Sequence, residues 1–137
     1  MGDVLARPLI KMLGLLPWKV DLVVPVPMGA DRAAERGYNQ AALLAMPVAL
    51  STGLLYQSKA LKKVRDISTQ VGLSIDERYE NVEGAFMADQ SIVDRKSVLV
   101  IDDVVTSGAT MDSCSETLRS AGARDVYGLT LARAKFK

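Results

Sequence analysis

Histidine is absent from this sequence of 137 residues, and cysteine occurs once, as Cys114. The lack of histidine excludes Ser-His-Asp and Cys-His nucleophiles and most catalytic zinc centres, because each of these sites needs an imidazole. A single cysteine also excludes a disulfide framework within the chain. General acid–base chemistry must therefore fall to carboxylates, tyrosine, lysine or the substrate itself.

Net charge is also nearly absent, since 17 Lys and Arg residues face 16 Asp and Glu residues. No overall field would recruit nucleic acid or anionic lipid, so any anion binding must be local, and direct nucleic-acid binding is not expected. The range 37–58 has no formal charge, but its Asn, Gln, Pro, Ser and Thr residues make it too polar for a membrane span. No secretory signal is recognisable. These features predict a cytoplasmic protein without a membrane segment.

Short apolar runs alternate with helical patterns along the chain. Strands are predicted near 21–27, 54–59, 84–87, 97–102 and 126–131, and helices at 8–16, 38–45, 74–81 and from 109 to about 121. The first helix should turn Leu9, Met12, Leu13 and Leu16 to one side, and Pro47 should end or kink the second. Cys114 falls on the apolar face of the last helix and is interpreted as a core residue. The alternation predicts a single α/β domain, 1–137, with a mostly parallel sheet and a helical N-terminal segment at 1–20.

Two acids and a turn of small residues follow the strand Val98–Ile101. The strand should deliver Asp102 and Asp103 to its carboxyl end, where ligands bind in open α/β sheets. The turn that opens the next helix would direct backbone N–H groups at an anion, and it consists of Thr106, Ser107, Gly108, Ala109 and Thr110. Carboxylates beside a phosphate repel it unless they contact something else, such as ribose hydroxyls. The alternative is that both acids are ordinary strand-end residues.

This thirteen-residue pattern resembles the phosphoribosyl-pyrophosphate (PRPP) signature of type I phosphoribosyltransferases. Two further blocks resemble the ComF family of phosphoribosyltransferase-like proteins: Val23-Val-Pro-Val-Pro27 followed by Arg36-Gly-Tyr-Asn-Gln40, and Arg65…Gln70…Arg78…Asn81…Gly84-Ala-Phe86. The resemblance implies the type I phosphoribosyltransferase fold with a small hood element. Members commonly carry an N-terminal four-cysteine zinc finger, which this sequence lacks.

The resemblance also implies roles for individual residues. The turn at 106–110 would bind the 5′-phosphate of PRPP, and Asp102 and Asp103 would contact ribose directly or through Mg²⁺ that arrives with PRPP. Arg32, Arg36 and Arg65 would contact the diphosphate, and Arg65 would be catalytic with the two acids. Thr69 and Gln70 would belong to a mobile lid at 59–70. Arg36 could equally be a solvated residue, and Asn39 is interpreted as a helix cap rather than a site residue.

The resemblance implies transfer of a phosphoribosyl group to an unidentified nucleobase-like acceptor, with release of diphosphate. The alternative is a non-catalytic PRPP-binding or nucleotide-binding accessory protein in competence and DNA uptake, with competence proteins as partners. Thr106 stands where enzymes of 6-oxopurine salvage usually have an aspartate, which argues against that substrate class. The protein alone is expected to provide no complete metal site, and a homodimer is left open.

Overall fold

The computed structural model describes residues 2–28, 39–64, 84–105 and 108–133. Its centre is a sheet of four strands: β1 (Leu22–Pro25), β2 (Leu55–Tyr56), β5 (Ser97–Val105) and β6 (Asp125–Arg133). The strand order is β2-β1-β5-β6, and every neighbouring pair is parallel. The predicted parallel α/β sheet is therefore confirmed.

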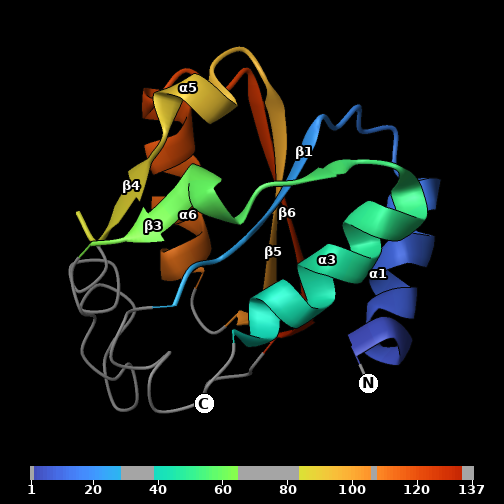
Figure 1. Ribbon diagram of the computed structural model, residues 1–137. Helices are drawn as coiled ribbons and strands as arrows, with labels where there is room; N and C mark the ends of the chain where they lie inside the picture. The colour runs from blue at the N-terminus through green and yellow to red at the C-terminus, as the bar shows by residue number, and fades with distance from the viewer. Residues whose placement is uncertain (1, 29–38, 65–83, 106–107, 134–137) are drawn as a thin grey trace, which may run out of the picture.

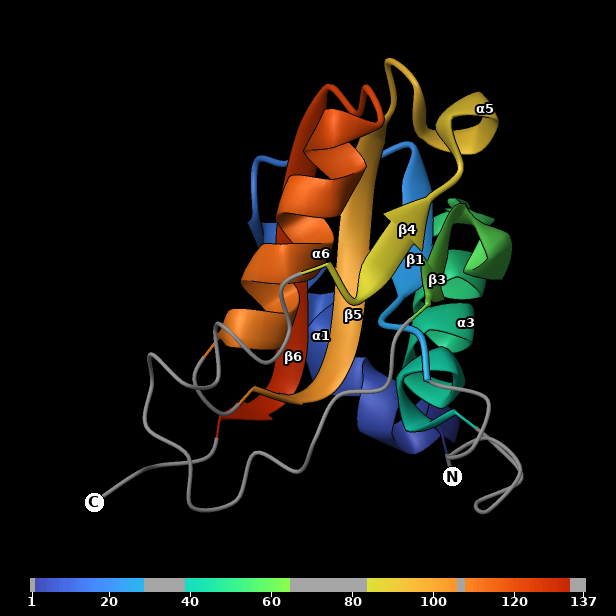
Figure 2. The same cartoon turned by 90° about the vertical axis from the view of Figure 1, so that its left-hand side faces the viewer.

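Both faces of this sheet are covered (Figures 1 and 2). Helices α1 (Gly2–Leu15) and α3 (Gln40–Thr52) cover one face. Helix α6 (Ala109–Ser120) and a two-stranded antiparallel sheet of β3 (Leu61–Lys63) and β4 (Phe86–Ala88) cover the other. Two short helices complete the described parts, η1 (Ser58–Ala60) and α5 (Gln90–Val93).

The continuous apolar runs of β1 and β5 follow from this double burial. Leu99 and Ile101 pack with α1 and α3, whereas Val98 and Val100 pack with α6 and the small sheet. All four side chains have no exposed surface. Successive strand residues point to opposite faces, so a strand buried on both sides cannot alternate apolar with polar residues.

Prolines proved to be weaker helix signals than expected. Pro8 lies inside α1 and Pro47 inside α3; of the two outcomes predicted for Pro47, an end of the helix is wrong, because α3 continues to Thr52. Buried residues flank Pro47 on α3, among them Val48, and their packing on the sheet outweighs the lost backbone hydrogen bond. The prediction that Met12 lies on the same side of the first helix as Leu9 and Leu13 is also wrong, because those two are buried and about half of the Met12 surface is exposed. No helix in the described ranges is both long and apolar enough to cross a membrane.

The predicted mobile loop at 59–70 is wrong in its first part. Leu61–Lys63 form β3, which pairs with Phe86–Ala88, and Leu61 is almost completely buried. The sequence does not reveal this strand for two reasons. Leu61 is followed by two lysines, so no apolar pattern is visible, and the partner strand lies more than twenty residues further along. Residues 65–70 and the helix predicted at 74–81 lie outside the described residues.

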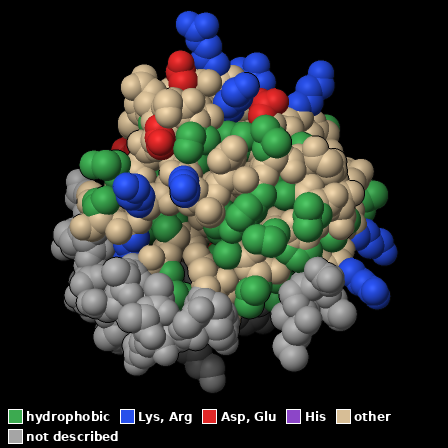
Figure 3. Space-filling view, viewed as in Figure 1, with side chains coloured by type: hydrophobic (Ala, Val, Ile, Leu, Met, Phe, Trp, Pro, Cys, Tyr) green, Lys and Arg blue, Asp and Glu red, His purple; other side chains and the backbone are tan. Residues whose placement is uncertain are grey.

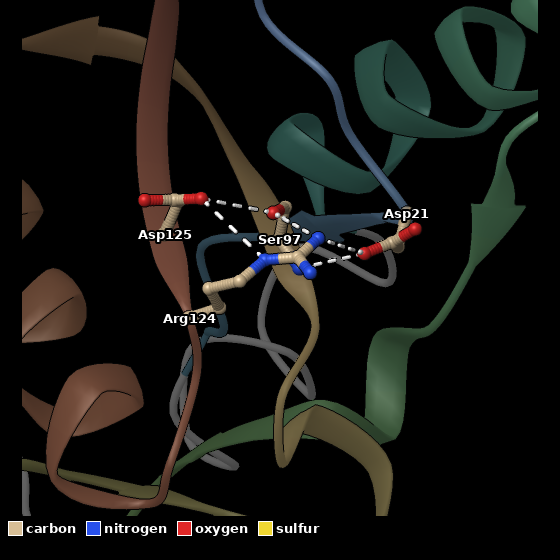
Figure 4. A network of polar contacts seen from close by, with 4 residues as sticks. All are labelled: Asp21, Ser97, Arg124 and Asp125. Atoms are coloured by element: carbon tan, nitrogen blue, oxygen red, sulfur yellow. Dashed lines mark hydrogen bonds and ion pairs between the residues drawn. The ribbon is translucent and has the colours of Figure 1, made fainter.

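At the amino ends of the strands, four side chains form a closed polar network (Figure 4). The backbone N–H of Ser97 donates to Asp21 at 2.8 Å, and its hydroxyl donates to Asp125 at 3.2 Å. Arg124 donates to the Ser97 hydroxyl at 3.2 Å and forms ion pairs with Asp21 and Asp125 at 3.5 and 3.7 Å. The network joins the starts of β1, β5 and β6.

Candidate functional site

The acidic pair lies inside a strand rather than at its end. β5 was predicted to stop at Asp102, but it continues to Val105, and Asp102 is in register with Thr130 of β6. The hydroxyl of Thr130 donates to the backbone oxygen of Asp103 at 3.2 Å. Pairing with β6 extends the strand, which the sequence of β5 alone does not show. The acids still lie within its carboxyl-terminal half, toward the edge where ligands bind in such sheets.

Asp102 has an environment that favours its protonated form. It follows Val98 and Val100 on the same side of β5, so its side chain continues the face covered by α6. Burial raises the pKa of Asp102 to about 7, and the neighbouring Asp103 carboxyl adds to the increase through a hydrogen bond and its charge. The backbone N–H of Asp103, which donates to Asp102 at 2.8 Å, acts in the opposite direction. Near neutral pH the pair therefore carries less than two full negative charges.

Gly108 stands directly before α6, the helix that follows β5 in the chain. Gly108 caps the helix with φ +86°, a left-handed conformation that glycine adopts without steric cost. Its backbone oxygen accepts from the N–H of Asp112 at 2.9 Å, which fixes the first turn of the helix. Ala109 is buried and Thr110 half-buried. The positive end of the α6 dipole therefore lies just beyond the strand that carries the acids; Thr106 and Ser107 fall outside the described residues.

The ends of the range that contains Arg32 and Arg36 are joined at the same edge of the sheet. Val26 follows β1, and its N–H donates to the backbone oxygen of Ile101 in β5 at 2.9 Å. The Asn39 amide donates to the backbone oxygen of Val26 at 3.1 Å, while its Oδ1 accepts from Ala41 and Ala42 at the start of α3. The interpretation of Asn39 as a helix cap is confirmed. Arg32 and Arg36 themselves lie outside the described residues.

The range that contains Arg65, Thr69 and Gln70 is joined at its ends in a similar way, because the N–H of Val64 donates to Ala85 at 2.7 Å. These three predicted site residues also lie outside the described residues. Of the predicted site residues, the structure describes Asp102 and Asp103 in β5 and Gly108, Ala109 and Thr110 at the start of α6, and the remaining ones lie outside the described residues.

Lys63 is a cation of the described chain that the sequence interpretation did not single out. In β3 it lies on the same side as the buried Leu61, which faces the main sheet. Burial is the main cause that raises the pKa of the Cys114 thiol; the charge of Asp102 raises it further, and that of Lys63 lowers it. Lys63 and Asp102 therefore lie within electrostatic reach of one buried thiol. The sequence shows this orientation only once β3 is known to be a strand, because its pairing partner β4 lies far along the chain.

The described residues contain no group of three or more His, Cys, Asp or Glu side chains that could hold a metal ion. Asp102 and Asp103 nevertheless have the chemistry that Mg²⁺ prefers, because carboxylate oxygens are hard ligands. Mg²⁺ in such sites is commonly bound by one or two carboxylates, with substrate phosphates and water completing its shell. The pair fits a metal ion that arrives with a phosphorylated ligand.

The profile of the phosphoribosyl transferase domain matches residues 3–135, and the chain belongs to that family. Its relatives include competence protein F of Haemophilus influenzae, 33% identical over 83% of this chain and 51% of that protein. The DNA utilization protein YhgH of Escherichia coli K12 is 34% identical over 82% of this chain and 49% of its own length. Competence protein ComFC of Streptococcus pneumoniae is 33% identical over 80% and 47%. The resemblance to the ComF family is confirmed, and the chain spans about half the length of these relatives.

Solved structures support the same fold. A glutamine PRPP amidotransferase of Bacillus subtilis superposes with a TM-score of 0.62 at 24% identity, covering 94% of this chain and 26% of that one. The adenine phosphoribosyltransferase of Giardia lamblia gives a TM-score of 0.60 at 14% identity, covering 98% and 80%. These likenesses establish the type I phosphoribosyltransferase fold predicted from the sequence.

Proposed function

We propose that this domain binds PRPP together with Mg²⁺ and transfers its phosphoribosyl group to a nucleobase-like acceptor, with release of diphosphate. The observation that carries the proposal is the order of elements at the carboxyl edge of the sheet. The strand β5 carries Asp102 and Asp103, and the next described residue in the chain after β5, Gly108, caps α6 in a left-handed conformation. Carboxylates suit ribose hydroxyls and Mg²⁺, and a helix amino terminus suits a phosphate.

In the proposed reaction the bond between C1′ of the ribose and the diphosphate oxygen breaks, a bond from C1′ to an acceptor nitrogen forms, and the proton of that nitrogen passes to the departing diphosphate. Residues 106–110 would hold the 5′-phosphate, and Asp102 and Asp103 would orient the ribose through its hydroxyls or through Mg²⁺, which would neutralise the departing diphosphate. Ligand binding would favour the ionised form of Asp102. Because burial and Asp103 keep part of a proton on it near neutrality, binding should release that proton.

Positive charge at the diphosphate would come from arginine and lysine. Arg32, Arg36 and Arg65 are the proposed contacts, and both ranges that contain them begin and end at described, hydrogen-bonded residues. Lys63 is a further proposed cation, because it acts electrostatically on the same thiol as Asp102. Cations from different elements would suit a leaving group that carries most of the ligand's charge.

Titration calorimetry with PRPP and Mg²⁺ tests this proposal. We expect binding that requires Mg²⁺. Because the pKa of Asp102 is about 7, binding at about pH 7 should also release protons, and the measured heat should then depend on the ionisation enthalpy of the buffer. Asp103→Asn should weaken PRPP much more than ribose-free phosphate or diphosphate. An equal loss for all three ligands would assign Asp103 a structural role, and no PRPP binding by the unaltered chain would overturn the proposal. Diphosphate release in a screen of nucleobases tests the transfer.

A second candidate is a PRPP-binding accessory protein without catalytic activity that acts with competence proteins. The names of the relatives, which refer to competence and DNA utilization, favour it. Arg65→Ala separates the two functions. In an enzyme it should reduce turnover far more than PRPP affinity, because it would act chiefly on the departing diphosphate. In an accessory protein, affinity should stay nearly unchanged and no turnover should be measurable in the parent chain.

A further inference from the structure

The acid pair of β5 lies where this strand is paired on one side only. The register of β5 with β1 ends at Ile101, opposite Pro25, whereas the register with β6 continues to Val105. Among the described strands, β6 is therefore the only one that pairs with β5 at Asp102 and Asp103. A segment paired on one side is held by fewer hydrogen bonds than the rest of its strand, so its backbone is fixed less firmly unless another contact supports it.

The acid pair also differs from other acidic side chains in its surroundings. On the face shown in Figure 3, Asp and Glu side chains lie at the surface toward the top of the view, where α5 and the amino ends of the strands lie in Figure 1. Asp102 and Asp103 are instead half-buried, in the carboxyl-terminal half of β5. A half-buried carboxyl group has fewer accessible rotamers than one in solvent, so the position of its oxygens depends on the backbone that carries it.

Thr130 of β6 supplies an additional contact to this backbone. It is in register with Asp102, and its hydroxyl donates to the backbone oxygen of Asp103 at 3.2 Å. The N–H of Asp103 donates to Oδ1 of Asp102 at 2.8 Å. Both polar groups of the Asp103 backbone are thus hydrogen-bonded, one to the other acid and one to the neighbouring strand. Because threonine is β-branched and Thr130 is half-buried, its hydroxyl has few alternative positions.

We propose that Thr130 is a positioning residue, which fixes the Asp103 backbone so that both carboxyl groups meet the ribose or Mg²⁺ in one arrangement. This inference rests on the proposed function, since PRPP is the ligand that the acids would orient. Thr130 would act through Asp103 and needs no contact with the ligand. A displacement of about 1 Å in a group that orients a substrate can cost about a hundredfold in rate, and a site that is ordered before binding loses less conformational entropy when the ligand arrives.

Thr130→Val tests the proposal, because valine has the same shape as threonine and lacks the hydroxyl. In titration calorimetry with Mg²⁺, we expect the affinity for PRPP to fall about tenfold, as the loss of one hydrogen bond of ordinary net strength predicts. The affinity for inorganic phosphate should stay unchanged, since the start of α6 and not the acid pair would bind it. Thr130→Ser keeps the hydroxyl and should restore most of the PRPP affinity.

Thr117→Val is the matched control. Thr117 in α6 is also half-buried, and its hydroxyl donates to the backbone oxygen of Ser113 at 2.7 Å. The same substitution therefore removes the same kind of hydrogen bond in another element. It should leave the affinity for PRPP unchanged, and circular dichroism checks that each variant folds.

Amide hydrogen exchange provides a measurement that needs no ligand. In Thr130→Val the amide of Asp103 should exchange about tenfold faster relative to that of Val98, which lies near the start of the same strand. In Thr130→Ser the ratio should return toward that of the parent chain. An unchanged ratio in Thr130→Val would overturn the proposal, because the hydroxyl would then not hold Asp103.

The binding results separate this inference from the proposed function. If the parent chain binds PRPP and Thr130→Val binds it equally well, this inference fails and the proposed function stands. Equal losses for PRPP and phosphate, or a loss that Thr130→Ser does not restore, would assign Thr130 a structural role instead. A parent chain that does not bind PRPP would overturn the proposed function, and hydrogen exchange alone would then decide whether Thr130 positions the acid pair.

Discussion

The two edges of the central sheet differ in how their acidic side chains are partnered. At the amino ends, Asp21 and Asp125 share one arginine, and the backbone N–H and hydroxyl of the buried Ser97 are both hydrogen-bonded within the network. At the carboxyl ends, Asp102 is half-buried beside a second carboxyl, and its pKa is raised. The first arrangement is complete without a ligand, while the second would gain from a cation or a hydroxyl. Changes at the amino edge should therefore alter stability, and changes at the carboxyl edge should alter binding.

The largest effect on binding is expected from Gly108→Val. Its φ of +86° is strained for a β-branched residue, so the turn before α6 should change shape and PRPP affinity should fall at least a hundredfold by calorimetry. Gly53→Val is the matched control, because Gly53 has φ +73° at the end of α3 and open space around an added Cβ. Both variants should lose about 1–3 kcal/mol of stability. Similar losses of PRPP affinity in the two variants would mean that strain at a glycine, and not its position at the carboxyl edge of the sheet, weakens binding.

Asp102→Asn should change how stability depends on pH. Between about pH 4 and pH 7 the folded wild type binds more protons than the unfolded chain, since its pKa is raised, so its free energy of unfolding falls as pH rises. The asparagine side chain does not titrate, so the free energy of unfolding of the variant does not fall in this way. At pH 8 the variant should be more stable than the wild type by at most about 4 kcal/mol, an upper bound that solvent screening reduces. Urea unfolding at pH 5 and pH 8 measures the difference.

Asp21→Ala should lower stability and leave PRPP binding unchanged. The substitution removes the acceptor of the buried Ser97 N–H, and an unsatisfied buried donor costs about 1–3 kcal/mol. Asp125→Ala should cost less, about 1 kcal/mol or below, because its ion pair with Arg124 is half exposed. Urea unfolding and calorimetry on the same samples provide both quantities. A marked loss of PRPP affinity in Asp21→Ala would mean that the two edges are coupled.

The smallest effect is expected from Lys63→Met. Removing the ammonium group should reduce the affinity for Mg²⁺ and PRPP several-fold while leaving the fold intact, because Lys63 is half-buried and the methionine keeps an apolar side chain over the sheet. The same change should raise the pKa of Cys114 further and slow its reaction with a thiol reagent. Lys62→Met, on the exposed side of β3, should change neither measurement.

Several elements could be predicted from the sequence because their signals are local. The run Val98–Ile101 identified a strand buried on both faces, and Asn39 before an apolar helix identified a cap. β3 could not be predicted, since Leu61 is one apolar residue among lysines and its burial depends on Phe86–Ala88 far along the chain. The extension of β5 past Asp102 likewise depends on pairing with β6.

The order of strand, acids and small residues in the sequence predicts a phosphate-binding edge, which stays a prediction. The structure shows that Asp102 and Asp103 belong to β5 and that Gly108 caps α6. The raised pKa of Asp102 depends on burial under α6 and on its neighbouring carboxyl, which spacing does not reveal. The orientation of Lys63 required knowledge that β3 is a strand. Both the raised pKa of Asp102 and the orientation of Lys63 depend on tertiary packing.

The hydrogen bond from Asn39 to Val26 joins residues thirteen positions apart and holds together the two ends of the chain segment between them. The same side chain also accepts two hydrogen bonds from the first turn of α3, so its carbonyl oxygen and its amide group have separate partners. One asparagine therefore sets both where α3 begins and how far that beginning lies from the end of β1.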